Sequence, residues 1–150
     1  MTLLNISGLS HHYAHGGFNG KHQHQAVLNN VSLTLKSGET VALLGRSCCG
    51  KSTLARLLVG LESPAQGNIS WRGEPLAKLN RAQRKAFRRD IQMVFQDPYA
   101  SLDPRMTIGD IVGEAIDIHH LAANKKERRD KIISLLETVG LNSEHANRYP

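Results

Sequence analysis

One stretch decides the fold of this chain, and it reads Gly45-Arg46-Ser47-Cys48-Cys49-Gly50-Lys51-Ser52-Thr53. It satisfies the phosphate-binding loop pattern G-x-x-x-x-G-K-S/T. In such a loop, backbone N–H groups surround phosphate oxygens, and the positive end of the following helix points at them. Lys51 can then reach the outer phosphates, and the Ser52 hydroxyl can ligate the magnesium ion that bridges them. The stretch therefore predicts a nucleotide-phosphate site.

The segments on either side of the loop support this interpretation. The apolar run Thr40–Leu44 precedes it and predicts a buried parallel strand. Leucines with the i, i+3, i+4, i+7 spacing of a packed helix face follow it: Leu54, Leu57, Leu58 and Leu61. Strand, loop and helix in this order are the context that the pattern requires. The alternative is an ordinary strand–turn–helix, but both flanks favour phosphate binding in an α/β fold.

Length, charge and cysteine content argue against a membrane-spanning, disulfide-linked or nucleic-acid-binding protein. A chain of 150 residues fits one domain with a real core. No apolar run approaches the roughly 20 residues of a membrane span, and the N-terminus lacks a signal-peptide layout. The two cysteines are adjacent within the loop, which favours a reducing cytosol over a disulfide framework. The net charge is +6, and the densest basic run is Arg81–Arg89, which we interpret as a solvated helix face. No nucleic-acid partner is therefore expected.

Two strands are expected before the loop, at Leu3–Leu9 and Ala26–Leu35, because both segments alternate apolar and polar residues. The residues between them look like a loop. This region holds five histidines: His11, His12, His15, His22 and His24. Imidazole suits nickel, copper and zinc, but the spacing matches no compact ligand template. A solvated loop is favoured, and a metal site stays open as the alternative.

After the loop helix, Asn68–Trp71 predicts a short strand, and Asn80 with Gln83 predicts a capping box that opens the basic helix. Ile91–Phe95 predicts another apolar strand, with Gln96 at its carboxyl end. In open α/β sheets, ligands bind at that end of the strands. Gln96 is therefore a candidate site residue.

Beyond Gln96 the sequence becomes helical. Capping pairs predict two helices, one at Ile108–Ile118 and one that opens after Asn124 and stops at Gly140. The second helix is expected to face inward through Ile132, Leu135, Leu136 and Val139. We therefore expect a nucleotide-binding α/β core over residues 1–96, followed by a partial helical subdomain over residues 97–150.

Taken together, these residues resemble the ATP-binding subunits of ABC transporters, and most closely the peptide/nickel importer group. The resemblance is carried by Tyr13, the loop Gly45–Thr53, the stretch Val94–Pro98 and the stretch Tyr99–Thr107. Residues 1–97 are most similar to the ATP-binding subunits of nickel importers. Residues 98–150 are more similar to those of oligopeptide and dipeptide importers. The resemblance implies an ABC-type P-loop NTPase fold.

The resemblance also implies roles for individual residues. The loop residues Gly45 to Thr53 would hold ATP, and Tyr13 would stack on the adenine ring. Gln96 corresponds to the glutamine that contacts magnesium or the attacking water. It would act in catalysis with Lys51, and it would share the Mg²⁺ ion with Ser52.

At the level of the whole molecule, the resemblance implies a transport ATPase that drives import of nickel or, alternatively, of peptides. Its partners would be a second ATP-binding subunit and inner-membrane permease subunits, onto which Ile108–Ile118 would dock. It would be peripheral, on the cytoplasmic side of the bacterial inner membrane. Alternatives of other kinds are a GTPase or nucleotide kinase, a nucleic-acid-associated P-loop ATPase module and a non-catalytic nucleotide-binding fragment. The lack of an Asn-Lys-x-Asp motif argues against GTP.

The sequence departs from the family pattern in two places. Cys48 stands where the family usually carries glycine, and a side chain in a left-handed backbone conformation costs roughly 1–2 kcal/mol. The sequence also contains no Ser-Gly-Gly-Gln signature and no apolar strand that ends in Asp-Glu. We therefore expect the C-terminal part of the family's ATPase to be absent, and these 150 residues alone to hydrolyse ATP negligibly.

Overall fold

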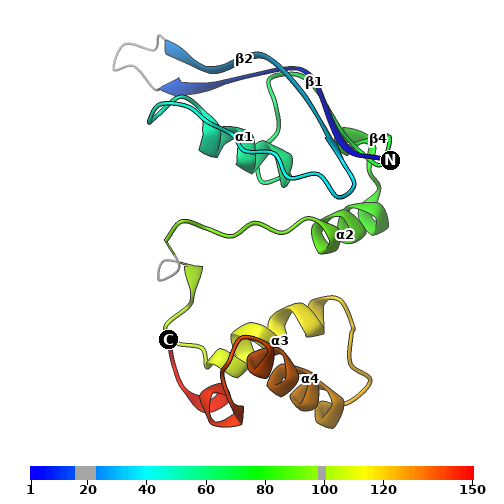
Figure 1. Cartoon of the computed structure of the whole chain (residues 1–150), viewed down its shortest axis with the longest axis vertical. Helices are drawn as coiled ribbons and strands as arrows, with labels where there is room; N and C mark the ends of the chain where they lie inside the picture. Colours follow the sequence, from blue (N-terminus) through cyan, green and yellow to red (C-terminus); the bar gives the residue numbers. More distant parts are fainter. Residues whose placement is uncertain (16–22, 98–100) are drawn as a thin grey trace. The chain divides into compact units, whose positions relative to one another are not determined.

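The computed structural model describes residues 1–15, 23–97 and 101–150. The chain forms two compact units, Met1–Met93 and Val94–Pro150, and each is described here by itself. Figure 1 shows the order of the elements along the chain. The sequence predicts a boundary after Gln96, between a nucleotide-binding core and a helical subdomain. Those functional assignments remain a prediction.

A four-stranded sheet forms the first unit, in the order β2-β1-β3-β4. The strands are β1 (Thr2–His15), β2 (Gln23–Lys36), β3 (Gln66–Trp71) and β4 (Glu74–Pro75). All neighbouring strands are antiparallel. The strands predicted around Leu4, Leu33 and Ile69 are thus confirmed.

The prediction of a loop between the first two strands is wrong for much of that segment, because both strands extend into it. β1 continues to His15, and β2 begins at Gln23. The ladder runs from Thr2 opposite Lys36 to His15 opposite Gln23, with several bulges. Backbone pairing satisfies the N–H and C=O groups of these polar residues whatever their side chains, so hydropathy alone did not predict the extension.

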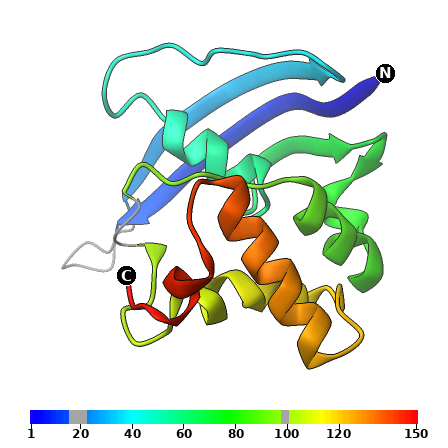
Figure 2. The ribbon, with the colours of Figure 1, turned by 60° about the horizontal axis from the view of Figure 1, so that its bottom comes forward.

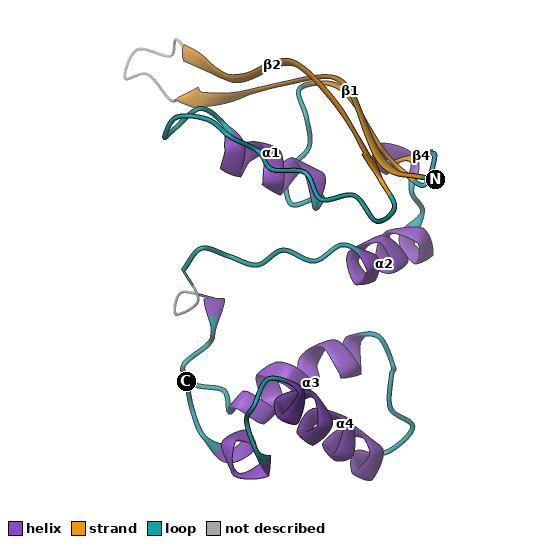
Figure 3. Ribbon diagram, in the orientation of Figure 1, coloured by secondary structure: helices purple, strands orange, loops and turns teal. Residues whose placement is uncertain are grey.

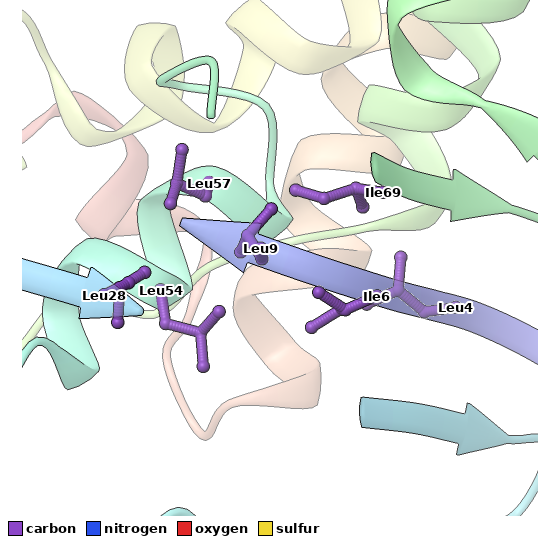
Figure 4. Close-up of a cluster of buried hydrophobic side chains, with 7 residues drawn as sticks. All are labelled: Leu4, Ile6, Leu9, Leu28, Leu54, Leu57 and Ile69. Carbon is purple, nitrogen blue, oxygen red and sulfur yellow. The ribbon is translucent and has the colours of Figure 1, made fainter. Parts of the chain in front are cut away.

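The core of the first unit lies between the sheet and α1 (Lys51–Leu58). Leu4, Ile6 and Leu9 of β1 are buried. They form one cluster with residues from three other elements: Leu28, Leu54, Leu57 and Ile69 (Figure 4). The predicted helix face is therefore confirmed for Leu54 and Leu57, whereas Leu61 lies beyond the end of α1 and is exposed. This cluster fixes the start of α1, and so the loop before it, against the sheet.

Two predicted strands do not form. Thr40–Leu44 and Ile91–Phe95 are drawn as loops in Figure 3, and the described residues provide neither with a strand partner. Leu44 is 89% exposed and Val94 is 96% exposed. A parallel strand receives its backbone hydrogen bonds from neighbouring strands, and all the strands of this sheet pair antiparallel. The apolar side chains of both segments are therefore mostly exposed, apart from Ile91 and Met93, which are partly buried.

A basic helix, α2 (Arg81–Asp90), closes the first unit after the short 3₁₀ turn η1 (Leu76–Lys78). Its predicted capping box is confirmed, because the Asn80 and Gln83 side chains each bond the other's backbone N–H. Phe87 is its buried residue and lies edge-on to Trp71, with ring centroids 5.6 Å apart. The basic side chains of Arg81–Arg89 are exposed, as predicted.

The second unit consists of α3 (Ile108–Ile118), α4 (Lys125–Thr138) and the 3₁₀ turn η3 (Ser143–Asn147). Figure 2 shows α3 and α4 packed side by side. The N-caps predicted at Thr107 and Asn124 are confirmed, since each side chain accepts a backbone N–H three residues on. In the described part of the chain, no helix is long and apolar enough to cross a membrane.

Only one face of α4 packs against α3. Ile132 and Leu136 are buried against Ile116 of α3, as predicted. The inward orientation predicted for Leu135 and Val139 is wrong, because both are exposed. Val139 is the C-cap, beyond the last helical residue, and Leu135 lies outside the cluster that α3 covers. Arg128 of α4 also donates to Asp117 of α3 at 2.9 Å, and this bond raises the pKa of Arg128.

Gly67 provides a test of the sheet. Its φ is +85°, and a Cβ added there would meet the Gly8 carbonyl and lie 2.7 Å from Leu9 Cα in β1. Gly73 has a φ of +86°, but a Cβ added there would meet only open space, so it is a matched control. We expect Gly67→Ala to lower the free energy of unfolding in urea by about 1–3 kcal/mol more than Gly73→Ala. Equal losses would show that β3 does not approach β1 this closely.

Candidate nucleotide-binding site

The phosphate loop leads directly into α1. Gly50 is the N-cap of the helix, with φ 96°, and an added Cβ would come 2.8 Å from the Val27 carbonyl of β2. Glycine is required here both for the left-handed turn and for the close approach to β2. The first turn of α1 has no acidic residue and no side-chain cap. Its free N–H groups and positive dipole end are therefore available to an anion.

Lys51 folds back over the loop that precedes it. Its ammonium donates to the carbonyl oxygens of Gly45 and Arg46, both at 2.7 Å, and lies 3.6 Å from Cys49 Sγ. Gly45 permits this turn, because a Cβ there would lie 2.6 Å from the same sulfur. A phosphate oxygen would be a stronger, charged acceptor than either neutral carbonyl. The lysine is therefore placed to exchange these bonds for a phosphate.

The two hydroxyls that follow Lys51 have different environments. Ser52 is exposed in the first turn of α1, where its oxygen is accessible to a cation. Thr53 is buried, and its Oγ1 lies 3.3 Å from the Tyr13 hydroxyl. Ser52 is thus the residue of the two that suits a metal ion.

Tyr13 lies beside the loop although it is 40 residues away in sequence. Besides its contact with Thr53, its hydroxyl donates to Glu62 Oε2 at 2.8 Å. The ring stands edge-on to His11, with centroids 4.9 Å apart. The structure therefore brings the predicted aromatic residue to the phosphate loop. Glu62 was not predicted from the sequence, because it lies just after α1 in what looked like a surface connection and matches no motif.

Cys48 adopts a left-handed backbone conformation, with φ 62°. Cys48 and Cys49 are both free thiols and both exposed. The backbone of the loop thus has the turn expected at this position, with a side chain that strains it.

Gln96 belongs to the second unit, where it is exposed. Within the first unit, the structure brings Tyr13 and Gly45–Thr53 together. Of the Tyr99–Thr107 stretch, residues 99 and 100 lie outside the described residues. Further along it, Arg105 donates to Asp103 at 3.0 Å and lowers the pKa of that carboxyl.

The histidine-rich segment is only partly described. His22 and the side chains of His15 and His24 lie outside the described residues. His11 is mostly buried, with Nε2 3.5 Å from Glu62 Oε2. Among the side chains that the structure does describe, no three His, Cys, Asp or Glu residues are grouped to hold a metal ion.

Cys48→Gly tests the strain in the loop. Glycine populates the left-handed conformation freely, so more molecules will hold the loop in the turned form that binds phosphate. We expect ATP to bind several-fold more tightly, measured by calorimetric titration. Cys48→Ala is the control, because it removes the thiol but keeps a Cβ at the same left-handed position, so ATP should bind as it does to the wild type. Unchanged affinity in Cys48→Gly would argue against strain at this position.

Comparison with known proteins gives consistent matches. The nickel import ATP-binding protein NikE of Escherichia coli K12 is 73% identical over 150 residues, which are all of this chain and 56% of that protein. The NikE protein of Shigella sonnei is 72% identical over the same length. The chain thus spans about half the length of the curated relatives it matches.

Solved structures share the fold. The ATP-binding cassette MJ0796, solved as a dimer in a post-hydrolysis state with ADP and Pi, matches with a TM-score of 0.81 and 27% identity over 99% of this chain and 62% of that one. Clostridium perfringens cbiO1, part of the ABC transporter complex cbiONQ, matches with a TM-score of 0.65 and 26% identity over 97% and 53%. Residues 28–150 also match the family described as ABC transporter. The chain therefore belongs to the ABC transporter family and has the fold of its P-loop ATPases.

Proposed function

We propose that this chain is the nucleotide-binding part of an ATP-binding subunit that couples ATP binding and hydrolysis to nickel import through a membrane permease. The observation that carries the proposal is the phosphate loop itself. A free helix N-terminus begins at Lys51, and the lysine ammonium lies against the carbonyls of Gly45 and Arg46. This arrangement concentrates positive charge and N–H donors where phosphates would bind.

Individual roles follow from this arrangement. Lys51 would bind the outer phosphates, and the exposed Ser52 hydroxyl would ligate the Mg²⁺ that accompanies ATP. Tyr13, one hydrogen bond from Thr53, would stack on the adenine base. Gln96, in the second unit, would contact the metal or the attacking water. Residues 1–96 would then bind the nucleotide, and residues 97–150 would respond to it.

Nickel is the proposed cargo because the relatives at 73% and 72% identity are nickel import proteins over the whole of this chain. This favours nickel over the oligopeptide alternative. The cargo would pass through the permease and would not touch this subunit. The partners would be a second ATP-binding subunit, as in dimeric MJ0796, and permease subunits at the cytoplasmic side of the inner membrane. Ile108–Ile118 is the proposed docking helix for the permease.

A chimera tests the proposal. The matching segment of Escherichia coli NikE is replaced by this chain, and radioactive nickel uptake is measured in cells that lack their own NikE. We expect the chimera to restore uptake. We expect Lys51→Ala to reduce uptake at least tenfold, because the outer phosphates lose their charged partner, a contact worth about 1.5–3 kcal/mol.

Lys85→Ala is the matched control, because Lys85 is an exposed lysine of α2 and is not part of the phosphate loop. It should leave nickel uptake unchanged. A chimera that is present in the membrane fraction but imports no nickel would contradict the nickel assignment. Full uptake by Lys51→Ala would contradict the role of the phosphate loop.

A further inference from the structure

The carboxylate of Glu62 is the centre of a small polar cluster beside the phosphate loop. Its side chain is 26% exposed, and both of its oxygens face other side chains. Oε2 accepts the Tyr13 hydroxyl at 2.8 Å and lies 3.5 Å from His11 Nε2. Oε1 lies 3.8 Å from an Arg56 guanidinium nitrogen. Residues of β1, of α1 and of the segment after α1 thus meet at one acidic group.

Tyr13 is the member of this cluster that the carboxylate fixes most directly. A phenol has one proton to donate, and the carboxylate is both nearer and more strongly accepting than Thr53 Oγ1 at 3.3 Å. The phenol proton is therefore donated to Glu62, beyond the last turn of α1, and the Thr53 hydroxyl in the first turn can donate to the phenol oxygen from 3.3 Å. His11 contacts the ring edge-on, so both the tip and one side of Tyr13 are in contact.

We propose that Glu62 is a positioning residue for the base of the bound nucleotide. It holds the Tyr13 ring in one orientation before the nucleotide arrives, and it does so without touching the nucleotide. The inference rests on the proposed function, because it assumes that a nucleotide binds at the loop and that its base stacks on Tyr13. It adds that the carboxylate after α1 controls the base-dependent part of the affinity.

The proposal can be tested by comparing the binding of ATP, which has a base, with the binding of a phosphate chain that has none. In the proposed function the phosphate loop binds only the phosphates, so inorganic tripolyphosphate would report on the loop alone. ATP reports on the loop and the base together. A residue that acts through Tyr13 changes ATP affinity and leaves tripolyphosphate affinity unchanged. A residue that merely stabilises the end of α1 changes both affinities, because α1 carries the loop.

The experiment is calorimetric titration of the full chain with magnesium ATP and with magnesium tripolyphosphate. Glu62→Ala removes the acceptor, and ordering the freed ring then costs affinity. We expect ATP to bind about three- to tenfold more weakly and tripolyphosphate to bind as before. Glu62→Gln retains an acceptor oxygen for the Tyr13 hydroxyl, so it should rescue ATP affinity to within about twofold of the wild type. Glu74→Ala is the control for loss of an acidic residue, because Glu74 is an exposed glutamate of β4.

Tyr13→Phe keeps the aromatic ring but removes the hydroxyl that donates to Glu62, so the same hydrogen bond is lost through its donor. It should reproduce the loss seen in Glu62→Ala, and the double variant should lose no more than either single variant. If Glu62→Ala binds neither ligand, its fold is damaged and Tyr13→Phe decides the question alone.

Equal loss of ATP and tripolyphosphate affinity in Tyr13→Phe, or no loss of either, would overturn the inference. Unchanged ATP affinity in a folded Glu62→Ala variant would do the same. A wild-type chain that binds neither ligand would instead refute the proposed function, on which the inference rests.

Discussion

The close contact between Gly50 and the Val27 carbonyl is the constraint on which the first unit depends. It lets the chain turn with a left-handed residue directly against β2 and begin α1 at Lys51. Leu54 and Leu57 then enter the core under β1, which holds the helix in place. The end of the phosphate loop, at Gly50, is consequently held against both β2 and the packed helix. Its N–H groups can be arranged in advance of any ligand, which lowers the cost of binding.

Features encoded over a few residues could be predicted from the sequence. The helix that begins after Gly50, the capping residues Asn80, Thr107 and Asn124, and the strand around Ile69 are all local signals, and the structure confirms them. A cap forms between a side chain and a backbone N–H three residues later. Because the two partners are neighbours in the sequence, the local sequence is enough to predict the cap. The left-handed turn at Cys48 was expected from the resemblance to ABC transporter ATPases, which implies a glycine at this position.

Features that depend on distant partners could not be predicted. Thr40–Leu44 and Ile91–Phe95 have strand-like sequences, but a strand forms only when a neighbour supplies its hydrogen bonds. β1 extends to His15 for the converse reason, because β2 supplies that partner to a polar segment. Glu62 becomes important only when the fold brings it to Tyr13, 49 residues away. Hydropathy patterns and short motifs do not predict such contacts between residues that are far apart in the sequence.

The central claim is that Gly45–Ser52, together with Tyr13, forms the binding site for ATP. Amide chemical shifts of the ¹⁵N-labelled chain, recorded by NMR before and after addition of magnesium ATP, test it most directly. The account predicts that the largest changes fall on the amides of Gly45–Ser52, with a further change at Tyr13. Unchanged loop amides, or largest changes along the basic helix Arg81–Asp90, would contradict it.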